Sequence, residues 1–111
     1  MKTLFIVNSE FFGNGNDELG QKLMGAFLKK LWAKQKKPQY IVFYNSAVKL
    51  LAKGSMHLDA LHGLSDLGVD LIACGTCVDF YGLTDCIEIG RISGMEEIVN
   101  LMELCPKVIT V

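Results

Sequence analysis

Two cysteines three positions apart, Cys74 and Cys77, are the residues of this chain best suited to chemistry. They enclose Gly75 and Thr76 and follow residues 69–73, a short apolar run with β-branched members that predicts a strand buried on both faces. Thr76 is a suitable N-cap, and apolar and aromatic residues recur after it at helical spacing. We therefore expect the cysteine pair at a strand-to-helix corner.

A corner of this kind, at the carboxyl end of a parallel strand, is where open α/β sheets bind ligands. The free N–H groups and the positive dipole end of the following helix favour a thiolate over a thiol. We interpret Cys74 as a solvent-accessible nucleophile. Cys77 is placed to attack a persulfide on Cys74 and to release it as a disulfide forms. The backbone N–H groups near Thr76 and Cys77 are candidates to hold a terminal sulfur.

Strand and helix patterns alternate along the rest of the chain. The other predicted strands are residues 3–7, 40–43, 86–89 and 107–111, with a loop over residues 90–94. The other predicted helices are residues 17–36, capped by Asn16 or Asp17, residues 47–53, capped by Ser46, residues 56–67, capped by Ser55, and residues 95–105. This order predicts one α/β domain over residues 1–111, a three-layer α/β/α fold with about five mostly parallel strands.

Polar residues also follow the first predicted strand. Asn8, Ser9 and Glu10 come directly after residues 3–7. Because parallel strands end at one edge of their sheet, we expect these three side chains to line the same pocket as Gly75 and Thr76.

Composition narrows the functional classes. Eleven basic and twelve acidic residues give a net charge of −1, which indicates neither a nucleic-acid nor a polyanion partner. No apolar run approaches the roughly 20 residues of a membrane helix, and no signal sequence is evident, so we expect a cytoplasmic protein. Half of the residues are hydrophobic, and the mean hydropathy of +0.31 suggests that some surface faces another subunit of a homo-oligomer.

Two other interpretations of the cysteines stay open. Cys74, Cys77, Cys86 and Cys105 are enough for a four-sulfur metal site, but only one Cys-x-x-Cys knuckle is present, so we predict neither a metal nor another cofactor. The second alternative is a non-catalytic oligomeric module, in which the thiols line a pocket for a partner or small ligand.

Several segments in order along the chain resemble one known family. They are the runs at residues 16–24, 54–55, 68–69, 74–83, 90–93 and 107–111, the most specific being Cys-Gly-Thr-Cys followed by Asp79, Gly82 and Leu83. They resemble the C-terminal, DsrE-like domain of the YedF family, which is associated with selenium metabolism and has the wider DsrE/DsrF/TusD-like sulfurtransferase fold. YedF-like proteins usually carry an N-terminal TusA/SirA-like domain, and we expect this chain to correspond to the second domain alone.

The resemblance implies a site and a role. In sulfur-relay relatives of the TusD type, one cysteine lies eight residues before a glycine, and counting back from Gly82 reaches Cys74. In those relatives this cysteine carries a persulfide between protein partners, within an oligomer. The implied function is a sulfurtransferase-like carrier of sulfur or selenium, which exchanges its cargo with a protein donor and a protein acceptor.

Overall fold

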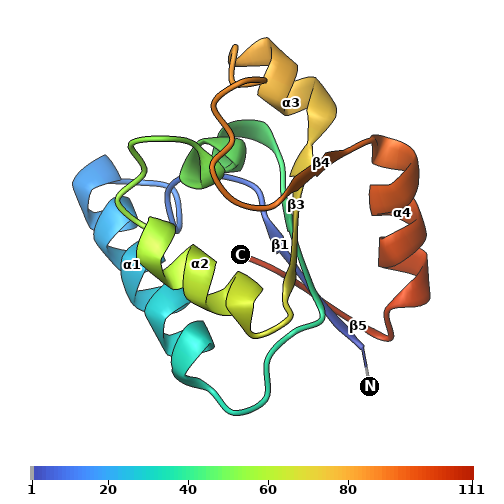
Figure 1. Cartoon of the computed structure of the whole chain (residues 1–111). Helices are drawn as coiled ribbons and strands as arrows, with labels where there is room; N and C mark the ends of the chain where they lie inside the picture. The colour runs from blue at the N-terminus through green and yellow to red at the C-terminus, as the bar shows by residue number, and fades with distance from the viewer. Residues whose placement is uncertain (1) are drawn as a thin grey trace.

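A computed structural model describes residues 2–111 and shows a sheet of five parallel strands in the order β4-β3-β2-β1-β5 (Figure 1). The strands are β1 (Thr3–Val7), β2 (Tyr40–Phe43), β3 (Asp70–Cys74), β4 (Arg91–Ser93) and β5 (Lys107–Thr110). The helices are α1 (Asp17–Ala33), the 3₁₀ helix η1 (Asn45–Leu51), α2 (Leu58–Asp66), α3 (Gly75–Phe80) and α4 (Met95–Leu104). The predicted α/β/α fold is confirmed.

Helices cover both faces of the sheet. In Figure 1, α1 and α2 lie on one side and α4 on the other, while α3 lies beyond the end of β3. On the first face, α1, η1 and α2 close one apolar core around side chains such as Phe43, Leu28 and Leu61. On the second face, Ile98 and Leu101 of α4 pack with Ile72 and its neighbours in a separate core.

The central strands are apolar because both of their faces are covered. Ile41, Val42 and Phe43 of β2 are fully buried, and residues 71–74 of β3 are buried as well. Alternate residues of one strand point to opposite faces, so Leu71 belongs to the first core and Ile72 to the second. The predicted strand over residues 69–73 is confirmed, with a shift of one residue.

The fourth strand is not where the sequence pattern placed it. Residues 86–89 form no ladder strand, and Ile87 makes only an isolated antiparallel bridge to Ala52. The strand is Arg91–Ser93, inside the predicted loop, and it pairs with β3. Two of its three residues are polar or charged, because it is an edge strand with one open side.

Gly90 sets up this edge strand. Its φ of +89° lies in the left-handed region, and a Cβ there would lie 2.9 Å from the carbonyl oxygen of Leu71 on β3. Glycine alone combines this backbone conformation with so close an approach to the neighbouring strand.

One predicted helix cap is confirmed, and several other predicted caps and helix ends are wrong. Asn16 caps α1, accepting a hydrogen bond from the N–H of Leu19 at 2.8 Å, as expected. The helix ends at Ala33 rather than at residue 36. Ser46 and Thr76 cap nothing, because η1 and α3 begin one residue before each of them.

The remaining cap prediction also failed. Ser55 precedes α2 by a short turn, in which its hydroxyl accepts from the N–H of His57, the N-cap residue of that helix.

No helix within residues 2–111 is long and apolar enough to cross a membrane.

An ion cluster fastens β4 and α4 to β3. The guanidinium of Arg91 donates to both carboxylate oxygens of Asp70 at 3.0 Å and to both of Glu97 at 2.7 Å, and the Ser93 hydroxyl also donates to Glu97. Arg91, and Ser93 after it, lower the pKa of Glu97 to about 2. The cluster thus joins two strands and one helix at the edge of the sheet.

Gly90→Ala is expected to lower the free energy of unfolding by about 2 kcal/mol or more, because alanine is strained at this φ and its Cβ meets the backbone of β3. The matched control is Gly15→Ala, where a Cβ meets nothing within 4 Å. Urea unfolding of both variants measures the difference. Equal stability of the two variants would contradict this packing.

Glu97→Gln is expected to destabilise the fold near neutral pH and progressively less in acid. Because the folded-state pKa of Glu97 is depressed, its contribution is complete above the unfolded value of 4.5 and is lost as the pH falls toward about 2. Urea midpoints of wild type and variant should therefore converge in acid. Glu96→Gln is the control, since Glu96 makes no ion pair within residues 2–111. A gap independent of pH would disprove the assignment.

Candidate functional site

The two cysteines of the predicted site occupy different environments. Cys74 is the last residue of β3 and the N-cap of α3, and its side chain is buried with 1% exposure in the core beneath α4. Cys77, in the first turn of α3, is partly exposed. The expectation that the Cys74 thiol is open to solvent was wrong, and Cys77 is the thiol that solvent reaches.

The buried position of Cys74 follows from the register of the sheet. Cys74 pairs with Ser93, two residues after the pair Ile72 and Arg91, so its side chain points to the same face as Ile72. That face is closed by Ile98 and Leu101 of α4. A strand-end position can therefore lie inside the core when a crossing helix covers it.

A backbone N–H from the neighbouring strand end fixes the Cys77 sulfur. Asn45, which follows β2, donates its N–H to Cys77 Sγ at 3.0 Å. Asn45 has a φ of 54°, a left-handed conformation that asparagine adopts more readily than most residues. In this conformation the N–H of Asn45 points at the Cys77 thiol, which lies at the neighbouring strand-to-helix corner.

The pKa of the Cys77 thiol results from opposing effects. Burial raises its pKa above the ordinary value, the N–H of Asn45 lowers it, and the neighbouring Cys74 thiol raises it again. The Cys74 thiol is thus among the groups that set the pKa of Cys77. The raised pKa favours the protonated form of Cys77.

Polar residues extend from Cys77 to the end of β1. The Tyr81 hydroxyl donates to Asn45 Oδ1 at 3.2 Å, and the Lys49 ammonium lies 4.6 Å from the centre of the Tyr81 ring. Lys49 also pairs with Glu10 at 3.3 Å. Glu10, Lys49 and Tyr81 line a cavity of about 360 Å³, so this series of contacts connects the thiol with a cavity wall.

Of the five predicted pocket residues, only Glu10 lines this cavity. The Glu10 N–H donates to Ser46 Oγ at 3.0 Å, which joins the ends of β1 and β2. The Ser9 hydroxyl accepts from the N–H of Phe11 and so shapes its own loop. Asn8 is exposed beside them.

The corner residues themselves are tightly placed. Gly75 lies against β4, since a Cβ there would be 3.3 Å from both the Ile92 side chain and the Ser93 carbonyl oxygen. Thr76 is exposed in the first turn of α3. These two residues are the only ones between Cys74 and Cys77 in the chain, so both cysteines belong to the first turn of α3 and its N-cap.

Sequence reasoning missed Asn45, Lys49 and Tyr81. Asn45 directly follows Tyr44 at the end of a predicted strand, and that position was the available signal, since parallel strand ends gather at one edge. Lys49 lies on η1, a 3₁₀ helix, and Tyr81 is the C-cap residue that follows α3. The α-helical spacing assumed for residues 47–53 does not hold there.

The metal alternative finds no support in the geometry. All four cysteines are free thiols. Within residues 2–111, no three side chains among His, Cys, Asp and Glu gather closely enough to hold a metal ion.

Three solved structures share this fold over nearly their full length. The ychN protein from E. coli has 18% identity and a TM-score of 0.70, with 99% of this chain and 98% of that one covered. MTH1491 from Methanobacterium thermoautotrophicum, a protein of unknown function, has 21% identity and a TM-score of 0.72, with 99% and 98% covered. BT1422 from Bacteroides thetaiotaomicron, also of unknown function, has 15% identity and a TM-score of 0.66, with 99% and 95% covered.

Sequence families give the firmer relationship. A comparison with curated proteins returns no significant match. The DsrE/DsrF-like family, by contrast, matches residues 1–111. Since this match spans the chain, the protein belongs to the DsrE/DsrF-like family.

Proposed function

We propose that this protein is a sulfur-relay carrier that takes a sulfane sulfur, or selenium in its place, onto the Cys74–Cys77 pair. The observation that carries the proposal is the partly exposed Cys77 sulfur, held by the N–H of Asn45 next to the buried Cys74 thiol. A carrier needs a reachable nucleophile and a donor that fixes its sulfur, and Cys77 and Asn45 supply these. Membership of a family linked to sulfur relay agrees with this role.

In this proposal the loading step is a thiol exchange. Cys77 loses its proton, and its thiolate attacks the terminal sulfur of a persulfide on the donor protein. An S–S bond forms at Cys77 Sγ, the S–S bond of the donor breaks, and the donor thiolate leaves with the electron pair. An acceptor nucleophile then attacks the terminal sulfur and restores the Cys77 thiolate.

The second thiol offers another discharge route. Cys74, after loss of its proton, attacks Cys77 Sγ, hydrosulfide leaves, and a Cys74–Cys77 disulfide forms. A dithiol reductant then returns both residues to thiols. The resemblance to YedF-like and TusD-like proteins implied that Cys74 carries the sulfur, whereas the burial of Cys74 supports Cys77 for the first attack and Cys74 for the resolving role.

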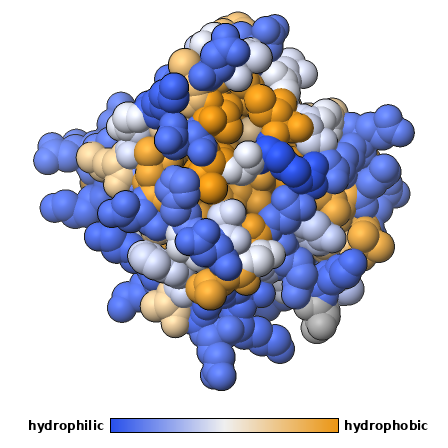
Figure 2. Space-filling model, viewed as in Figure 1, coloured by the Kyte–Doolittle hydropathy of each residue, from blue (hydrophilic) through white to orange (hydrophobic). Residues whose placement is uncertain are grey.

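The proposed setting is a homo-oligomer in the cytoplasm. Four free thiols suit a reducing compartment. Large apolar side chains are exposed on and beside α4, including Met95 at 51% and Leu104 at 58%. Apolar surface (orange) also gathers near the middle of the face in Figure 2, which supports contacts with further copies or with a sulfur donor.

Incubation with a persulfide-loaded donor is expected to raise the intact mass of the protein by one sulfur atom. Cys77→Ala should abolish this gain, because it removes the accessible nucleophile, and Cys74→Ala should retain it. Cys86→Ala is the matched control, a partly buried thiol outside the site. Loss of loading only in Cys74→Ala would move the sulfur to Cys74, and loading that survives in both variants would overturn the carrier proposal.

The reaction of Cys77 with iodoacetamide is expected to accelerate about ten-fold per pH unit up to at least pH 8.5, because only the thiolate reacts and burial raises the pKa of this thiol. The rate is measured by peptide mass spectrometry at the Cys77 site. A rate that levels off near about pH 7 would indicate a depressed pKa and contradict the described environment.

A further inference from the structure

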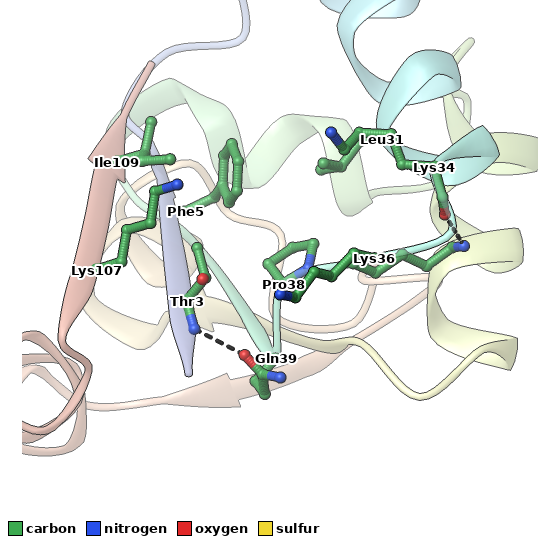
Figure 3. A pocket seen from close by; sticks show the side chains of 10 residues that line it. Thr3, Phe5, Leu31, Lys34, Lys36, Pro38, Gln39, Lys107 and Ile109 are labelled. Atoms are coloured by element: carbon green, nitrogen blue, oxygen red, sulfur yellow. Dashed lines mark hydrogen bonds between the residues drawn. The ribbon is translucent and has the colours of Figure 1, made fainter. Parts of the chain in front are cut away.

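A second cavity lies where the strands begin, whereas the thiols lie where the strands end. It borders Thr3 and Lys107, the first residues of β1 and β5, whereas Cys74 ends β3. Because all five strands are parallel, their starts and ends lie at opposite edges of the sheet. The cavity measures about 310 Å³, and Figure 3 shows side chains from α1, β1, β5 and the segment before β2 around it.

The inner wall of this basic cavity is apolar. Phe5 of β1 and Ile109 of β5 are direct partners in the sheet, so both side chains point to the face that α1 covers. Leu31 of α1 closes the wall and is only 5% exposed. Such a surface favours the apolar part of a ligand.

The rim is cationic and carries no carboxylate. Four of the eleven basic residues of the chain line it, namely Lys34, Lys36, Lys37 and Lys107, and no Asp or Glu is among the lining residues. None of the four forms an ion pair within residues 2–111. Like charges gathered around one concavity repel each other, and an anion between them relieves that repulsion.

Ordinary structural roles explain only part of this cluster. Lys37 donates to the carbonyl oxygen of Lys34, the C-cap residue of α1, and so satisfies a backbone carbonyl at the helix end. Lys107 discourages edge pairing on β5, for which any exposed charge suffices. Neither role explains why Lys36 and Lys107, from different parts of the chain, share one apolar-walled cavity.

Neutral donors complete the wall. The Gln39 side-chain oxygen accepts from the N–H of Thr3 at 2.7 Å, and this leaves the amide NH₂ group of Gln39 as a donor beside the lysines. Donors and cations around an apolar wall suit one chemical class, an anionic oxygen group attached to an apolar body.

We propose that this basic cavity binds a small organic carboxylate with an aliphatic or aromatic body. The ammonium groups of the rim hold the carboxylate, and Phe5, Leu31 and Ile109 contact the apolar part. The site is independent of the proposed sulfur chemistry, since it lies at the other edge of the sheet.

The test is a nitrogen-15 NMR titration of the full chain with octanoate and with its neutral counterpart octanamide. Octanoate is expected to shift the backbone signals of Gln39, Lys107 and Ile109 in a saturable manner. Binding should weaken at higher salt, because three of the four rim lysines are exposed. Octanamide should bind at least about three-fold more weakly, since it lacks the charge.

The double variant Lys36→Gln, Lys107→Gln is expected to weaken octanoate binding by about three- to ten-fold. The matched control is Lys22→Gln, Lys30→Gln, which removes two exposed charges of α1 outside the cavity and should leave the affinity unchanged. The NMR spectrum of each variant reports whether it is folded. Absence of saturable shifts, equal binding of octanamide, or equal loss in both double variants would overturn the proposal.

Discussion

The parallel register of β1, β2 and β3 is the constraint on which the rest of this structure depends. Val7 pairs with Phe43, and Phe43 with Ala73, so the three strands end side by side. The chain leaves each strand at the same edge, and the loops there are brought together regardless of their distance in sequence. Asn45 reaches Cys77 only because of this pairing, although 32 positions separate them.

The same register gives the two thiols different environments. Side-chain alternation sends Cys74 beneath α4, and the first turn of α3 returns Cys77 to the surface. A buried thiol is protected from chance oxidation, whereas an exposed one meets partners. One corner of the chain therefore holds a buried and a partly exposed sulfur.

The features that the sequence predicted well are those with strong local signals. Apolar β-branched runs marked β1, β2 and β3, and Asn16 marked the start of α1. The short edge strand β4 failed this approach because Arg91 and Ser93 make it polar, and its partners decide its pairing. The burial of Cys74 was equally hidden, since it depends on where α4 crosses the sheet.

The pairing of β1 with β5 has a consequence for folding during synthesis. β5 pairs with β1, Thr3 opposite Lys107, so β1 keeps one side open until the last of the other four strands of this sheet has been synthesised. On the ribosome, β1 and β2 can associate early, but the backbone groups on the outer side of β1 wait for a segment translated much later. A nascent chain stalled between α4 and β5 would therefore expose the unpaired backbone groups of β1, a surface that favours aggregation and that chaperones shield.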